Sequence, residues 1–136
     1  MTGRRIQTFE EPQVVRYEFG QQFSWHYDAI PKTLQDSSGN RLVTLLVYLN
    51  DVSIGGATTF KDLGIQVKPV KGKALLFFPC FADGTPDDRT MHAGQVAGET
   101  KWITQMWLHE NDYLPKSPEG SNHADAIVEI ERLKLD

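Results

Sequence analysis

The chain has 136 residues, of which 40% are hydrophobic and 24% charged, and a formal net charge of −4 at pH 7. This composition is typical of one soluble globular domain and excludes disorder across the whole chain. The acidic balance argues against a general affinity for nucleic acid or anionic membranes, and no apolar run approaches the ~20 residues that a membrane-spanning helix needs. The first residues lack the apolar stretch of a signal peptide and the lone cysteine forms no internal disulfide, so we expect a soluble protein compatible with the cytoplasm.

Short apolar segments separated by Gly, Pro, Asn and Asp clusters predict a mainly β protein. In chain order, the expected strands are Val14 to Phe19, Phe23 to Asp28, Leu42 to Leu49, Ala57 to Phe60, Ile65 to Lys68, Lys73 to Phe78, His92 to Val96 and Lys101 to His109. Eight short strands with this punctuation are typical of a sandwich or jelly roll.

Two of the predicted loops are long, Ala29 to Asn40 and Pro79 to Met91. Loops of this length in a compact domain are usually functional covers or flexible segments. We interpret both as walls of a substrate cleft, with solvated flexible loops as the alternative.

After Glu110 the pattern changes. Asn111 to Asn122 is polar and interrupted by prolines, and apolar residues then recur at helical spacing over Ala124 to Leu135. The sequence therefore predicts a core over residues 1–110, followed over 111–136 by a linker and a short amphipathic helix.

The segment Phe23 to Asp28 alternates large aromatic with small or polar residues. On a regular strand, His26 and Asp28 would point to one side, and Phe23, Trp25 and Tyr27 to the other. Such a pair can also be the polar face of a half-buried strand.

Together with His92, the pair offers two imidazoles and one carboxylate. This donor set favours non-haem Fe(II) and leaves coordination positions open. A structural zinc site is disfavoured, because such sites are usually closed by Cys and His.

Lys101 follows His92 by nine residues. We expect the strand that begins at His92 to turn at Ala97-Gly98 into the strand carrying Lys101, and this hairpin would bring an ammonium near the metal without touching it. An ordinary charged strand residue is the alternative.

From about Gln13 to Trp107 the chain resembles the prolyl 4-hydroxylase family of Fe(II)- and 2-oxoglutarate-dependent dioxygenases. The segments that carry the resemblance are Gln13 to Asp28, Arg41 to Asp51, Gly55 to Phe60, Val67 to Phe78, His92 to Gly94 and Lys101 to Trp102. The resemblance implies a double-stranded β-helix of the jelly-roll, cupin-like type. It also implies hydroxylation of a C–H bond with release of succinate and CO2, and Phe81 to Arg89 is similar to the subgroup that favours C4 of a peptidyl proline.

The resemblance also implies roles for individual residues. His26, Asp28 and His92 would be the catalytic Fe(II) ligands. Lys101 would pair with the distal carboxylate of the co-substrate 2-oxoglutarate, and the other residues expected to bind this co-substrate are Tyr17, Thr58 and Trp107. Arg41 would face the peptide groove. Dioxygen and a proline-containing peptide or protein are the implied partners, and ascorbate the implied reductant.

Three positions keep alternative interpretations. Trp107 could be a buried core aromatic, Arg41 an exposed strand-end arginine, and the Thr58 segment matches imperfectly because the family commonly has Glu where this chain has Ala57. At the level of function, the alternatives are a hydroxylase of a free amino acid or other small molecule, and a metal-binding jelly roll without catalysis. Lys101 argues against the last, because a structural metal site needs no anchor for a dicarboxylate.

Relatives in the family usually carry helices before the first strand that back one sheet, and this chain starts almost at that strand. We therefore expect the sheet face formed by Val15, Leu45 and Val47 to be covered by the Ala124 to Leu135 helix or by a second subunit.

Overall fold

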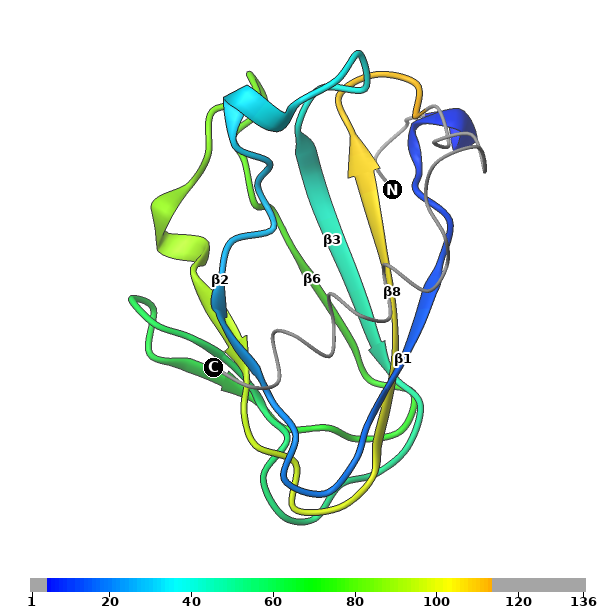
Figure 1. The fold of residues 1–136 in the computed structure, drawn as a ribbon, viewed down its shortest axis with the longest axis vertical. Helices are drawn as coiled ribbons and strands as arrows, with labels where there is room; N and C mark the ends of the chain where they lie inside the picture. Colours follow the sequence, from blue (N-terminus) through cyan, green and yellow to red (C-terminus); the bar gives the residue numbers. More distant parts are fainter. Residues whose placement is uncertain (1–4, 114–136) are drawn as a thin grey trace.

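The computed structural model describes residues 5–113 and confirms a mainly β fold, in which two antiparallel four-stranded sheets face each other (Figure 1). The strands are β1 (Gln13–Tyr17), β2 (Phe23–His26), β3 (Arg41–Tyr48), β4 (Thr58–Phe60), β5 (Ile65–Val67), β6 (Ala74–Phe77), β7 (His92–Gly94) and β8 (Lys101–His109), with short 3-10 helices η1 (Ile6–Thr8), η2 (Lys32–Leu34) and η3 (Asp88–Thr90). The first sheet has the order β1-β8-β3-β6 and the second the order β2-β7-β4-β5. Two facing sheets of this kind are the jelly-roll arrangement predicted from the sequence.

The inner face of the first sheet carries part of the core and one wall of a cavity. Leu46, Tyr48 and Ile103 form a buried cluster, and Val15, directly opposite Ile103 in the β1–β8 register, packs against it. The prediction that Val15 shares a face with Leu45 and Val47 was therefore wrong. Side chains alternate between the faces of a sheet, and the pairing with Ile103 fixes Val15 on the inner side.

The outer face of the first sheet is apolar and, among residues 5–113, only partly covered. Leu45 pairs with Leu76 of β6, which is 51% exposed, and Val14 and Trp102 are also exposed. The predicted helix from Ala124 to Leu135 lies outside the described residues, so its covering role stays a prediction. In the described part of the chain, no helix is long and apolar enough to span a membrane.

The connection between β7 and β8 passes from one sheet to the other. β7 pairs with β2 and β4, whereas β8 pairs with β1 and β3, so the predicted hairpin between His92 and Lys101 was wrong. The connection is fixed instead by the Gly55-Gly56 turn, where the Gly56 N–H donates to the Val96 carbonyl. Gly55 has φ of +68°, and a Cβ there would lie 2.2 Å from the Val96 oxygen, so this approach requires glycine. Lys101 consequently begins a strand in the sheet that faces His92.

The two long loops are joined by Asn40, which is fully buried. Its Oδ1 accepts from the backbone N–H of Ile30 at 2.6 Å and its Nδ2 donates to the Gly84 carbonyl at 3.2 Å. Its own N–H donates to the Glu110 carboxylate at 2.7 Å. The Asn40 side chain thus ties the two loops together, and its backbone N–H ties them to the end of β8, beside the two segments that carry the candidate metal ligands.

Candidate metal centre

The two histidines of the candidate site are cross-strand neighbours. His26 ends β2 and pairs with His92 at the start of β7, and their ring centroids lie 4.2 Å apart. The β2–β7 register shifts between Phe23 and His26. The predicted alternation over the whole segment was therefore wrong: Phe23 lies on the His26 side, with its ring centroid 4.0 Å from that of His26, and β2 ends before Asp28. A bulge redirects side chains in this way and is not visible in the residue pattern.

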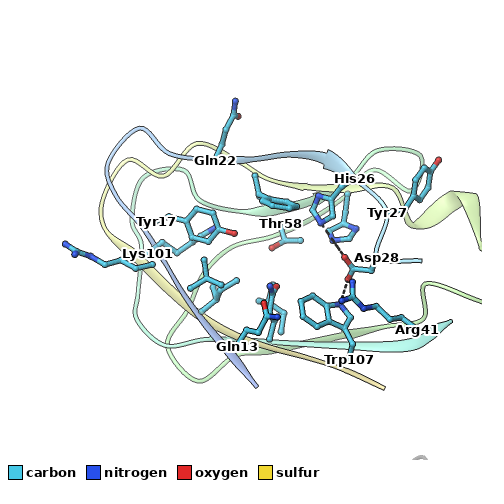
Figure 2. A pocket seen from close by; sticks show the side chains of 18 residues that line it. Gln13, Tyr17, Gln22, His26, Tyr27, Asp28, Arg41, Thr58, Lys101 and Trp107 are labelled. Atoms are coloured by element: carbon cyan, nitrogen blue, oxygen red, sulfur yellow. Dashed lines mark hydrogen bonds and ion pairs between the residues drawn. The ribbon is translucent and has the colours of Figure 1, made fainter. Parts of the chain in front are cut away.

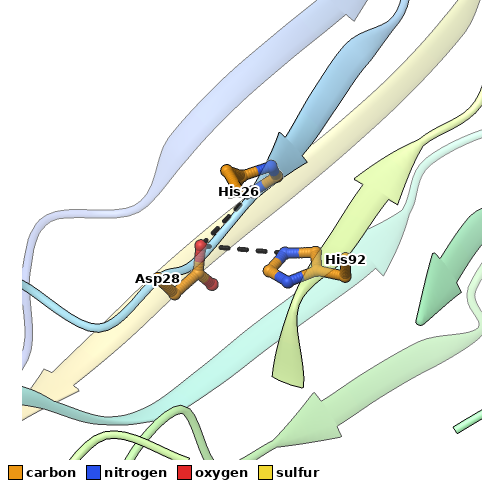
Figure 3. Close-up of side chains that lie close together, drawn as sticks. All are labelled: His26, Asp28 and His92. Carbon is orange, nitrogen blue, oxygen red and sulfur yellow. Dashed lines mark ion pairs between the residues drawn. The ribbon is translucent and has the colours of Figure 1, made fainter. Parts of the chain in front are cut away.

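Both histidines turn the same nitrogen toward the site. Each Nδ1 lies 2.8 Å from a backbone carbonyl two residues earlier, that of Ser24 for His26 and that of Thr90 for His92. In the tautomer in which Nδ1–H donates a hydrogen bond to these carbonyls, the Nε2 lone pair is free for a metal. Asp28 Oδ1 lies 3.5 Å from His26 Nε2 and 3.7 Å from His92 Nε2 (Figure 3). The ligand atoms of the three residues lie within 4.8 Å of one another, close enough to share one ion.

The electrostatics of the site favour the metal-binding forms of Asp28 and His92. Burial alone would raise the pKa of Asp28, but the contacts with His26, His92 and the Thr44 hydroxyl outweigh it and hold the pKa well below its usual range. Burial lowers the pKa of His92, which favours the neutral imidazole. A carboxylate and a neutral imidazole are the protonation states that coordinate a cation.

The second oxygen of Asp28 contacts the first sheet. Asp28 Oδ2 accepts a hydrogen bond from the Thr44 hydroxyl at 2.6 Å and another from Trp107 Nε1 at 3.0 Å. Thr44 and Trp107 are 2% and 6% exposed, respectively. Trp107 therefore lies beside the candidate metal ligands and contacts one of them directly, and its predicted role toward the co-substrate stays a prediction.

A cavity of about 450 Å³ extends from these ligands between the two sheets (Figure 2). Lys101 lies toward its other end and is 2% exposed. Its Nζ donates to the Gly56 carbonyl at 3.0 Å and lies 4.2 Å from the centroid of the Tyr17 ring. Within residues 5–113, no carboxylate lies within ion-pair distance of this ammonium, and burial lowers the pKa of Lys101 to about 8. A buried cation without a protein counter-ion is suited to an anionic ligand.

Two hydroxyl groups line the same cavity. Burial and the charge of Asp28 raise the pKa of Tyr17 to about 12, so its hydroxyl stays protonated and can donate. Thr58 is buried, and the hydroxyl of Tyr48 donates to its Oγ1 at 2.7 Å. Tyr48 was not predicted as part of the site, because its partner lies on another strand.

Arg41 lies at the metal end of the cavity and is not free in solvent. Its Nε donates to Glu10 at 2.7 Å, and its guanidinium carbon lies 4.0 Å from the centroid of a Trp107 ring. His109 Nε2 lies 2.6 Å from the same Glu10 carboxylate. Sequence reasoning missed Glu10, which precedes the first strand and shows no local signal. It also missed Thr44, although a polar residue inside the apolar run of β3 was a usable signal.

The chain belongs to the 2OG-Fe(II) oxygenase superfamily, whose family profile matches residues 12–109. Its curated relatives include the human prolyl 4-hydroxylase subunit alpha-1, which is 41% identical over 116 residues covering 81% of this chain and 22% of the relative. Prolyl 4-hydroxylase 2 of Arabidopsis thaliana is 33% identical over 147 residues covering 90% of this chain and 49% of the relative. The chain thus spans about a fifth to a half of the length of these relatives.

Among solved structures, the viral collagen prolyl hydroxylase of Paramecium bursaria Chlorella virus-1, in its complex with 2OG, superposes with a TM-score of 0.68 and 33% identity. The superposition covers 74% of this chain and 59% of the viral protein. These comparisons confirm the family resemblance seen in the sequence and the jelly-roll fold that it implies.

Proposed function

We propose that this chain is the catalytic domain of an Fe(II)- and 2-oxoglutarate-dependent dioxygenase that hydroxylates C4 of a proline within a peptide. The observation that carries the proposal is one cavity with three converging ligand atoms at one end and the buried ammonium of Lys101 toward the other. This ammonium has no carboxylate partner among the described residues 5–113. A metal chelator with a distal carboxylate would satisfy both ends at once.

The residues present fit an Fe(II) ion. His26, Asp28 and His92 offer two imidazole nitrogens and one carboxylate oxygen on one side, with both Nδ1 positions already used by backbone carbonyls. When bound, Fe(II) and 2-oxoglutarate supply the activation of dioxygen that no side chain can perform, with release of succinate and CO2. Ascorbate is the proposed external reductant that keeps the iron ferrous.

The remaining side chains of the cavity would hold and orient the co-substrate. Lys101 would pair with its distal carboxylate, and the hydroxyls of Tyr17 and Thr58 would donate hydrogen bonds to it. The Thr58 hydroxyl lines the same cavity and lies 2.7 Å from the Tyr48 hydroxyl. The Trp107 ring would form part of the wall next to the metal.

A peptide substrate is supported by the mouth of the cavity and by the relatives. Tyr27 lines the cavity, is 41% exposed and follows His26 directly, so an aromatic surface borders the metal end. Proline-rich segments adopt an extended helix that docks on aromatic surfaces. Arg41 lies at the same end and would contact the peptide. The relatives named above are prolyl 4-hydroxylases and a collagen prolyl hydroxylase.

The test is mass spectrometry of a proline-rich peptide incubated with the chain, Fe(II), ascorbate and 2-oxoglutarate. We expect a gain of one oxygen atom on proline, coupled to succinate, and loss of both in Asp28→Ala with the circular dichroism spectrum retained. Near-normal turnover by that variant would exclude the ligand assignment. Oxygen gained by a free amino acid instead would establish the small-molecule alternative, and metal binding without any succinate would establish a non-catalytic module.

A further inference from the structure

We propose that Thr44 and Trp107 are positioning residues that restrict Asp28 to a single metal-binding oxygen. This inference rests on the proposed metal site and deepens it. It concerns the oxygen of Asp28 that faces away from the histidines.

The two oxygens of Asp28 have different surroundings. Oδ1 faces both histidine Nε2 atoms, whereas Oδ2 accepts from Thr44 at 2.6 Å and from Trp107 at 3.0 Å. A carboxylate oxygen has about two lone-pair directions, so two donors saturate Oδ2. Hydrogen bonds to an ionised acceptor are among the stronger ones in proteins, and all three residues are buried, so water does not compete.

Both donors are side by side on the opposite sheet. Thr44 of β3 and Trp107 of β8 are directly paired in the strand register, and Asp28 follows β2 of the second sheet. Their spacing is therefore set by the backbone ladder and not by flexible side chains. Trp107 is further supported by the Arg41 guanidinium against its ring.

The chemical consequence concerns how many positions remain open on the ion. With one oxygen from Asp28 and two nitrogens, three positions of an octahedral ion stay available. A carboxylate that coordinates through both oxygens would occupy one of these. Thr44 and Trp107 thus protect the space that a two-point chelating co-substrate and dioxygen would need. Trp107 would therefore have two roles: its Nε1–H orients the Asp28 carboxylate, and its ring forms part of the cavity wall.

The test is a titration of the full chain with Co(II), without co-substrate, that records the dissociation constant and the visible absorption spectrum of the bound ion. Thr44→Val keeps the shape and removes the donor, and we expect about 10–100-fold weaker binding, the usual effect of removing such a supporting contact. The spectrum should change as well, because the coordination changes. Thr44→Ser retains the hydroxyl and should restore both.

The matched control is Thr59→Val, because the Thr59 hydroxyl is buried and has no hydrogen-bond partner in the part of the chain that the structure describes. It should leave the Co(II) affinity and spectrum unchanged. Wild-type affinity and spectrum in Thr44→Val would overturn the proposal, even if its melting temperature fell, because the hydroxyl would then support only the fold. Should Thr44→Val not fold, Trp107→Phe carries the test with the same two outcomes.

His92→Ala separates this proposal from the metal site itself. If His92→Ala abolishes Co(II) binding and Thr44→Val does not weaken it, only the positioning role is wrong. If His92→Ala binds as tightly as the wild type, the metal site is wrong and the positioning role falls with it.

Discussion

At the scale of single residues, Lys101 has an unusual environment for a lysine. It is buried, donates to the Gly56 carbonyl and lies over the Tyr17 ring. We predict that Lys101→Ala raises the dissociation constant of 2-oxoglutarate far more than that of the metal, because the ammonium is remote from the ligand atoms. Separate calorimetric titrations measure the two constants. Equal losses in both would mean that Lys101 only supports the fold.

The same residue predicts a pH dependence. The pKa of Lys101 is lowered to about 8 by burial, and an anionic ligand binds only the charged form. The affinity for 2-oxoglutarate should therefore be highest below pH 8 and fall above it, by roughly tenfold per pH unit once the free lysine is deprotonated. The Lys101→Ala variant should bind 2-oxoglutarate weakly at every pH, and its affinity should not fall above pH 8. A flat wild-type profile between pH 7 and 9.5 would contradict the assignment.

At the scale of elements, Asn40 holds two loops that sequence reasoning treated as independent. Asn40→Ala would leave the Ile30 N–H without its buried acceptor and remove the contact to Gly84. A buried unsatisfied group costs about 1–3 kcal/mol, so we predict a loss of at least that size in the free energy of unfolding, measured in urea. Asn111→Ala removes an exposed contact to the Ser37 carbonyl and should cost under ~0.5 kcal/mol.

The loop from Ala29 to Asn40 is also the candidate cover of the cleft. Its end is fixed by Asn40, so any closure should be confined to the part around η2, where Leu34 is 73% exposed. We predict fast hydrogen exchange there in the free protein and slower exchange at saturating peptide. Unchanged exchange would show that this loop is a fixed wall.

The sequence predicted elements well where a pattern repeats within a segment. The strand cores of β3 and β8 could be read from such a pattern, whereas the grouping of His26, Asp28 and His92 was implied by the resemblance to a family. It did not predict the shift in β2 that turns Phe23 toward His26, or the passage of the β7–β8 connection between sheets. Both depend on pairing between distant strands. Glu10 was missed for the same reason, because Arg41 and His109, which it contacts, are far away in the chain.

At the scale of the whole molecule, the metal should contribute to stability. An ion that binds only the folded state adds about 2.7 kcal/mol when its free concentration is a hundred times its dissociation constant. For a domain of this size, that corresponds to roughly 10 °C in melting temperature. We predict such a shift with Mn(II), reversed by a chelator and absent in His92→Ala. A similar shift in that variant would place the stabilising ion elsewhere.

The placement of the site across two sheets has a consequence for folding. The two histidines come from neighbouring strands of the second sheet, whereas the donors that hold Asp28 come from the first. A molten globule with both sheets formed but loosely packed would keep the two histidines side by side. It would lose the hydrogen bonds from Thr44 and Trp107 that orient the Asp28 carboxylate. High metal affinity should therefore appear only in the last step of refolding, when the side chains between the sheets interlock. Metal binding during refolding would then report native side-chain packing, at a stage when the far-UV circular dichroism signal of the strands has already reached its native value.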